Sequence, residues 1–143
     1  MGVTVKTKNR AMDLGYSGFN RLRTKVAELA AEDIGRHYKK LEGAWFITDK
    51  EWKKKFFENY NKKITELSER YNGEKDGILH FLYASDGGAE IPVKACKEIW
   101  EVIKEYDDDI RYGYSGRKDC AMFKDFKQIV KDCIDNDCSM VWF

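Results

Sequence analysis

The sequence predicts a predominantly helical α+β fold, with about four main helices and a small sheet formed by the N- and C-terminal strands. Apolar residues recur every three or four positions along most of the chain, which is the spacing of one face of an amphipathic helix. Short runs of β-branched and aromatic residues at the two ends are typical of strands. Because 143 residues is near the commonest domain size, we expect a single domain spanning residues 1–143.

The N-terminal quarter predicts a strand followed by a long helix. Residues 3–7 are rich in β-branched side chains and predict the first strand. Residues 13–18 contain two glycines and are expected to form a loop. The first helix is then expected over residues 19–41, with Gly43 ending it. Its apolar stripe consists of Phe19, Leu22, Val26, Leu29, Ala30, Ile34, Tyr38 and Leu41.

A capping box predicts the start of the second helix. The Thr48 hydroxyl can accept a hydrogen bond from the Glu51 amide, while the Glu51 carboxylate reaches back to the first residue. The helix is expected to run to about residue 71, where Asn72 and Gly73 end it. Its inner stripe is expected to be Trp52, Phe56, Tyr60, Ile64, Leu67 and Tyr71.

The C-terminal half predicts two further helices and a closing strand. Residues 77–83 form an apolar run too short for its period to separate strand from helix, and a helix is slightly favoured. Residues 84–88 form a turn, and Pro92 stands where the first residue of the third helix would be. Asp119 is expected to cap the fourth helix, and residues 139–143 are expected to pair with the N-terminal strand. The expected inner faces are Val93, Cys96, Ile99, Trp100, Ile103 and Tyr106, and then Met122, Phe123, Phe126, Ile129, Val130 and Cys133.

Composition and chain ends predict a cytoplasmic protein with no membrane association. The chain is 14% aromatic and 36% charged, which argues against disorder. No apolar stretch approaches the ~20 residues of a membrane span. The first residues also lack the apolar segment of a secretion signal.

The four cysteines all lie in the last third of the chain. No Cys-x-x-Cys motif is present among them, and no histidine follows at zinc-ligand spacing; the four are Cys96, Cys120, Cys133 and Cys138. We expect reduced structural thiols, with a Cys120–Cys138 or a Cys133–Cys138 disulfide left open. No metal site and no cofactor are therefore predicted.

Catalytic signals are weak. The turn at residues 85–90 has a glycine pattern like that of a calcium loop, but Glu90 and Lys94 occupy its required apolar and glutamate positions. An acid–base pair could be drawn from His80, Asp86 and Glu90, although His80 is also explained as a packed core histidine. His37 stands beside basic residues and is expected on the solvated surface. Without a nucleophile elbow or a phosphate-cradling loop, the chain is not expected to be an enzyme.

Two candidate binding surfaces follow from the remaining polar and aromatic residues. The aromatic side chains of Tyr16 and Phe19 interleave with Arg21 and Arg23, a combination that holds nucleotides or single-stranded nucleic acid by stacking and phosphate contacts. A solvated helix face explains the same residues. The turn that contains Asp86 and Glu90 is the second candidate.

Three short motifs resemble segments of small uncharacterised proteins encoded by bacterial, phage and prophage genomes. They are the Met-Gly-x-x-Val start with Gly-Tyr-Ser-Gly-Phe-Asn-Arg-Leu-Arg at residues 15–23, the Ser-Asp-Gly-Gly-Ala-Glu-Ile turn at residues 85–91 leading to Cys96, and Cys133 with the Val-Trp-Phe ending. In similar proteins the turn carries Asp-Cys or Asp-x-Asp, whereas here Gly87 replaces a side chain. The resemblance implies an anti-defence protein that masks a host protein or holds a signalling nucleotide.

The sequence therefore predicts a non-enzymatic, cytoplasmic binding protein, and the resemblance implies that it is phage-encoded. Its expected partner is a host protein that it inhibits, or a nucleotide or nucleic acid that it sequesters. One alternative is a nucleotide- or nucleic-acid-processing enzyme that uses His80, Asp86 and Glu90. Another is a structural module that forms a homodimer through its aromatic helices.

Overall fold

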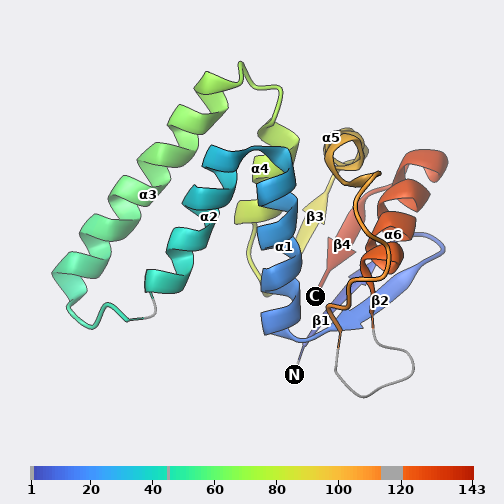
Figure 1. Cartoon of the computed structure of the whole chain (residues 1–143), viewed down its shortest axis with the longest axis horizontal. Coiled ribbons are helices and arrows are strands. Elements are labelled where there is room, and N and C mark those ends of the chain that lie inside the picture. The colour runs from blue at the N-terminus through green and yellow to red at the C-terminus, as the bar shows by residue number, and fades with distance from the viewer. Residues whose placement is uncertain (1, 45, 114–120) are drawn as a thin grey trace.

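Four short strands form one antiparallel sheet in the computed structural model, which describes residues 2–44, 46–113 and 121–143 (Figure 1). They are β1 (Val3–Lys6), β2 (Ala11–Leu14), β3 (Ala89–Ile91) and β4 (Met140–Trp142), in the order β2-β1-β4-β3. The predicted pairing of the N- and C-terminal strands is confirmed, because Val5 lies opposite Trp142. The edge strands β2 and β3 were not predicted, since Ala-Met-Asp-Leu and Ala-Glu-Ile contain almost none of the β-branched and aromatic residues that indicate strands.

Six helices lie in the described residues, where about four were predicted. The first pair, α1 (Tyr16–Ala30) and α2 (Glu32–Ala44), replaces the single helix expected over residues 19–41. Ala31 breaks it by adopting an extended conformation, with φ −171° and ψ 151°. Gly35 lets α2 fold back against α1, because a Cβ placed there would lie 3.0 Å from Glu28 Cα. The apolar spacing continues across the break, which is why it predicts one helix.

The later helices follow the sequence pattern more closely. They are α3 (Lys50–Arg70), α4 (Asp76–Tyr83), α5 (Val93–Ile103) and α6 (Phe123–Asn136). The favoured helix at residues 77–83 is confirmed as α4. The capping residue of α3 is Asp49 and not Thr48, because Asp49 Oδ1 accepts from the amides of Glu51 at 2.9 Å and Trp52 at 3.0 Å. Asp119 lies outside the described residues.

The core joins the sheet to the helices through buried aromatic rings. The Trp142 ring of β4 lies 5.1 Å from the Phe19 ring of α1 and 5.7 Å from the Phe81 ring of α4, centroid to centroid. Phe81 in turn lies 5.5 Å from Phe126 of α6. Much of the predicted inner face of α5 and most of that of α6 are buried here, including Cys96, Ile99, Ile103, Phe123, Phe126, Ile129, Val130 and Cys133. Cys96, Cys133 and Cys138 are free thiols.

Helix α3 projects from this core beside α2 (Figure 1). The buried residues of α3 lie in the C-terminal half of α3. Of its predicted inner stripe, Tyr60 and Leu67 are buried, whereas the Trp52 side chain is 72% exposed. The prediction for Trp52 is therefore wrong. Among the described residues, no helix is long and apolar enough to span a lipid bilayer.

Candidate binding pocket

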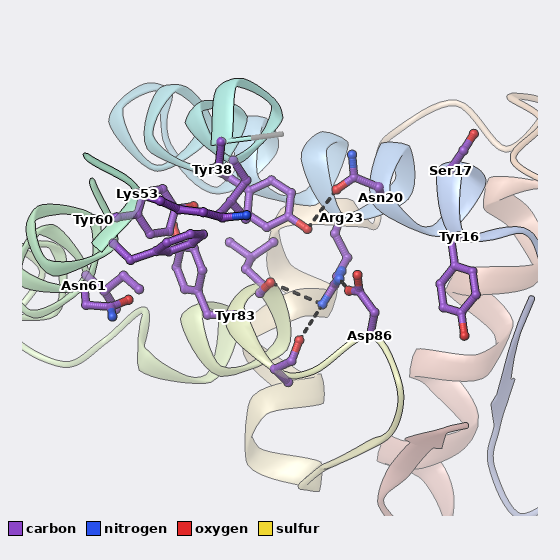
Figure 2. Close-up of a pocket in the computed structure, with 16 residues that line it drawn as sticks. Tyr16, Ser17, Asn20, Arg23, Tyr38, Lys53, Tyr60, Asn61, Tyr83 and Asp86 are labelled. Carbon is purple, nitrogen blue, oxygen red and sulfur yellow. Dashed lines mark hydrogen bonds and ion pairs between the residues drawn. The ribbon is translucent and has the colours of Figure 1, made fainter. Parts of the chain in front are cut away.

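A pocket of about 900 Å³ opens between α3 and the helices α1, α2 and α4 (Figure 2). Its volume is in the range of small-molecule sites. The pocket exists because α3 leans away from the core and contacts α2 and α4 along one edge (Figure 1). Five aromatic side chains line it: Tyr16, Tyr38, Phe57, Tyr60 and Tyr83.

Arg23 forms one end of the pocket. The turn of α1 that follows Asn20 carries this side chain inward, where it is 3% exposed. Its Nη1 donates to three backbone carbonyls at the C-terminal end of α4, those of Phe81 at 3.5 Å, Leu82 at 3.3 Å and Ala84 at 2.9 Å. A cation at this position also complements the negative end of the helix dipole. Arg23 therefore fixes the end of α4.

The Arg23 guanidinium is packed and paired as well as hydrogen-bonded. The Phe19 ring lies beneath it, with 4.5 Å between the guanidinium carbon and the ring centroid. Nη2 forms an ion pair with Asp86 Oδ1, from the turn after α4 (Figure 2). Burial lowers the pKa of Arg23 from its ordinary value, with Tyr38 and Tyr60 opposing the shift. Its buried Nε has no hydrogen-bond partner within the described part of the chain.

The middle of the pocket is a wall of tyrosines held by a buried histidine. His37 stacks on the Tyr60 ring at 3.9 Å between centroids, and its Nε2 lies 3.0 Å from the Tyr60 carbonyl oxygen. Because a carbonyl only accepts, Nε2 carries the proton and the Tyr83 hydroxyl donates to Nδ1 at 2.6 Å. Tyr38 donates to Asn20 Oδ1 at 3.3 Å. The hydroxyl bonds of Tyr38 and Tyr83 and the stacking of Tyr60 on His37 fix the orientation of these rings.

The surface position predicted for His37 is wrong. The residue is 2% exposed, because its place on α2 faces Tyr60 of α3. Burial lowers its pKa from the ordinary value, and the charges of Lys40 and Lys63 act in the same direction. Burial also raises the pKa values of Tyr60 and Tyr83. At neutral pH the three side chains are therefore uncharged.

Lys53 brings a positive charge to the opposite end of the pocket. Its side chain extends from α3 towards Tyr38, and Arg23 and Asp86 lie beyond Tyr38 on the far side (Figure 2). No acidic group of the described residues pairs with it. The pocket thus combines stacked rings, an unpaired cation and a paired Arg23–Asp86 end, an arrangement suited to holding a flat, negatively charged molecule. No family model, curated protein or solved structure matches the chain.

The predicted binding residues divide between this pocket and other surfaces. Tyr16, Arg23 and Asp86 line the pocket together, although they are far apart in the sequence. Phe19 is buried directly behind Arg23. Arg21 is exposed outside the pocket, with its guanidinium carbon 5.6 Å from the centroid of the Tyr112 ring. Glu90 is exposed on β3, where it pairs with Val141.

The proposed acid–base residues do not form a constellation. His80 is exposed on α4, so its prediction as a packed core histidine is wrong. Within the structured parts of the chain, no hydrogen bond or ion pair joins His80, Asp86 and Glu90, and Asp86 is paired with Arg23. Within residues 2–44, 46–113 and 121–143, no group of three or more His, Cys, Asp or Glu could hold a metal ion.

Several pocket residues were missed as binding residues. Tyr38 and Tyr60 lie on predicted apolar stripes, which marks them as core and gives no sign of a cavity beside them. Lys53 belongs to a recognisable run of three lysines, but the run does not show which member faces inward. Asn20 and Asn61 carry no sequence signal.

Proposed function

We propose that this chain is a non-enzymatic binding protein that sequesters a small molecule combining a flat ring with negative charge, and that a nucleotide is the ligand class its pocket suits best. The observation that carries the proposal is the unpaired Lys53 ammonium extending into a cavity walled by tyrosines. We further propose that the protein acts in the cytoplasm, where nucleotides are abundant, and that it is phage-encoded and blunts a host defence.

The aromatic walls support a flat ligand. The hydroxyls of Tyr38 and Tyr83 bond to Asn20 and His37, and the Tyr60 ring stacks on His37, so these rings lose little freedom when a ligand binds. Among the lining rings, Tyr16 is exposed and Phe57 and Tyr83 are half-buried, so a planar base can stack on these three. Each base–aromatic contact contributes about 1–3 kcal/mol. An aliphatic ligand would gain apolar contact without this stacking.

The charge distribution supports an anion. Lys53 and Arg23 are the basic side chains among the lining residues, and Asp86 neutralises Arg23. The net charge left in the cavity is therefore positive and is centred on Lys53. A phosphate group would pair with this ammonium through charge-assisted hydrogen bonds, which are roughly twice as strong as neutral ones.

The protonation states support binding without chemistry. The raised pKa values of Tyr60 and Tyr83 keep their hydroxyls protonated at neutral pH, so neither acts as a base. Both ring nitrogens of His37 are occupied by internal hydrogen bonds. Titratable groups tuned near pH 7 are the usual mark of acid–base catalysis.

Calorimetry and thermal melting with a panel of nucleoside monophosphates test this proposal. At a nucleotide concentration of about 100 times Kd, we expect a rise in Tm of about 10 °C. The variant Lys53→Met should weaken binding roughly 10-fold, because one charged contact is lost. Lys54→Met is the matched control, since Lys54 is exposed outside the pocket and should bind like the original protein. If no nucleotide raises Tm, or if both variants bind equally well, the proposal is wrong.

A second candidate function, the masking of a host protein, is favoured by an exposed patch around the start of α3. Phe46 is 85% exposed and Trp52 is 72% exposed, and lysines 50, 54 and 55 lie beside them. Aromatic side chains are enriched in protein interfaces, and tryptophan is among the residues that contribute most to binding there. The double variant Phe46→Ala, Trp52→Ala separates the two functions, because it should leave nucleotide binding intact while abolishing any inhibition of a host protein.

A further inference from the structure

The Asp86 carboxylate is difficult to reconcile with a pocket that serves only to hold an anion. Asp86 is the only acidic side chain among the described residues that line the cavity. Its Oδ1 is paired with Arg23, while its Oδ2 has no partner in the structured ranges and its side chain is 59% exposed. A carboxylate repels a phosphate and accepts hydrogen bonds, so its natural ligand is a group that donates them.

The position of this carboxylate is fixed by the surrounding backbone. The Gly87 amide donates to Ser85 Oγ at 3.1 Å, which closes the turn on both sides of Asp86. The Ser85 carbonyl accepts from the indole Nε1 of buried Trp142 at 2.8 Å, which ties the turn to the sheet. This ordered turn and the ion pair of Oδ1 with buried Arg23 together hold the carboxylate before a ligand arrives, as expected of a group that selects its ligand.

The two ends of the pocket differ in charge. Lys53 approaches the cavity from α3, whereas Asp86 and Arg23 lie together beyond Tyr38 on the α1 side (Figure 2). A nucleotide has the same polarity, since its phosphate is anionic and its base edge and ribose carry neutral donors. The phosphate is favoured near Lys53 over the neutral Arg23–Asp86 pair, so the charges orient the molecule.

We propose that Asp86 is a specificity-determining residue that accepts hydrogen bonds from two neighbouring donors on the uncharged part of a nucleotide whose phosphate faces Lys53. This rests on the proposed nucleotide-binding function and names the ligand feature that the pocket selects. Two parts of a nucleotide carry such a donor pair: the N1–H and 2-amino groups of guanine, and the 2′,3′-diol of ribose. A carboxylate recognises both by the same hydrogen-bond geometry.

A calorimetric panel with the full chain tests the proposal and separates the two sources. The probes are GMP, IMP, which lacks the 2-amino group, and 2′-deoxy-GMP, which lacks one hydroxyl. The original protein should bind GMP roughly 10-fold or more tightly than one of the other two. A preference over IMP assigns Asp86 to the guanine edge, and a preference over 2′-deoxy-GMP assigns it to the diol.

The variant Asp86→Asn removes the charge while keeping the shape of the side chain. It should weaken GMP binding about 10- to 100-fold and should remove the preference between the probes. Glu90→Gln is the matched control, because Glu90 is exposed on β3 outside the pocket and should leave both properties unchanged. A residue that merely stabilised Arg23 would lower affinity for all probes by the same factor.

The outcomes are distinguishable from failure of the proposed function. If none of the probes or other nucleotides binds the original protein, both proposals fall. If nucleotides bind but the original protein binds all three probes equally, the role of Asp86 is refuted while nucleotide binding stands; this measurement needs no variant. If Asp86→Asn keeps the original preference, the role of Asp86 is likewise refuted.

Discussion

Replacing Gly18 with alanine should destabilise the protein, although the same change in most helices stabilises it. Gly18 lies in the first turn of α1, where alanine is normally favoured by about 1 kcal/mol. Here a Cβ would clash with the carbonyl oxygen of Tyr112 and would lie 3.2 Å from the Tyr112 carbonyl carbon. The close approach of two backbone segments therefore requires glycine.

The expected loss is about 2 kcal/mol. The obstacle is backbone and not a flexible side chain, and Tyr112 is tied to Ala121 by a hydrogen bond from its amide at 2.8 Å. The neighbouring Gly113 amide donates to the same carbonyl at 2.9 Å, so the segment resists moving away. Overpacking of this kind costs typically 1–3 kcal/mol, and the helix preference for alanine offsets a part of it.

Urea denaturation of two glycine variants provides the measurement. Gly43→Ala is the matched control, because it also lies in a helix and no heavy atom lies within 4 Å of its added Cβ. We expect Gly43→Ala to raise the free energy of unfolding by about 0.5–1 kcal/mol and Gly18→Ala to lower it. A Gly18→Ala protein as stable as the original would refute the packing of α1 against Tyr112.

Two further predictions concern the buried polar residues of the pocket wall. Because burial lowers the pKa of His37, the fold favours its neutral form; the stability this provides is present above pH 6.5 and lost as pH falls through the lowered pKa. Chemical denaturation should therefore show that the free energy of unfolding falls between pH 7 and pH 5, and that it falls less in His37→Asn than in the original protein. An equal fall in both proteins would contradict the buried position of His37. Tyr60→Phe should leave stability unchanged or raise it by about 1 kcal/mol, because the buried hydroxyl has no partner among the described residues. Tyr83→Phe should lower stability by about 1–2 kcal/mol, since it leaves His37 Nδ1 unpaired; equal effects of the two changes, measured in urea, would refute this hydrogen-bond assignment.

The parts of the fold predicted from the sequence are those determined locally. The apolar stripe of α6, which includes Phe126 and Val130, is buried in the hydrophobic core, as the spacing of these residues predicts. The terminal strands were recognised because β-branched and aromatic residues stand at both chain ends. The break at Ala31 was not predictable in this way, because alanine favours helices and tertiary packing overrides its preference.

The pocket was only partly predictable, because apolar spacing does not distinguish a core from the wall of a cavity. Tyr38 was correctly placed on the inner stripe, yet its hydroxyl faces a polar partner beside an open space. The buried position of His37 did have a signal. It stands three residues after Ile34 and four before Leu41, which puts it on the inner stripe despite its basic neighbours. Arg23 and Asp86 meet through tertiary structure alone.

The order of the strands has a consequence for biosynthesis. The strand made first, β1, lies at the centre of the sheet beside the strand made last, β4, which also holds β3 through the pairing of Ile91 with Met140. A nascent chain that has reached α6 can form the β1–β2 hairpin, but it leaves β3 without a partner and lacks the Trp142 ring between Phe19 and Phe81. The four-stranded sheet can therefore form only after residue 142 has emerged from the ribosome. The helices synthesised earlier complete their common core only when β4 packs against them.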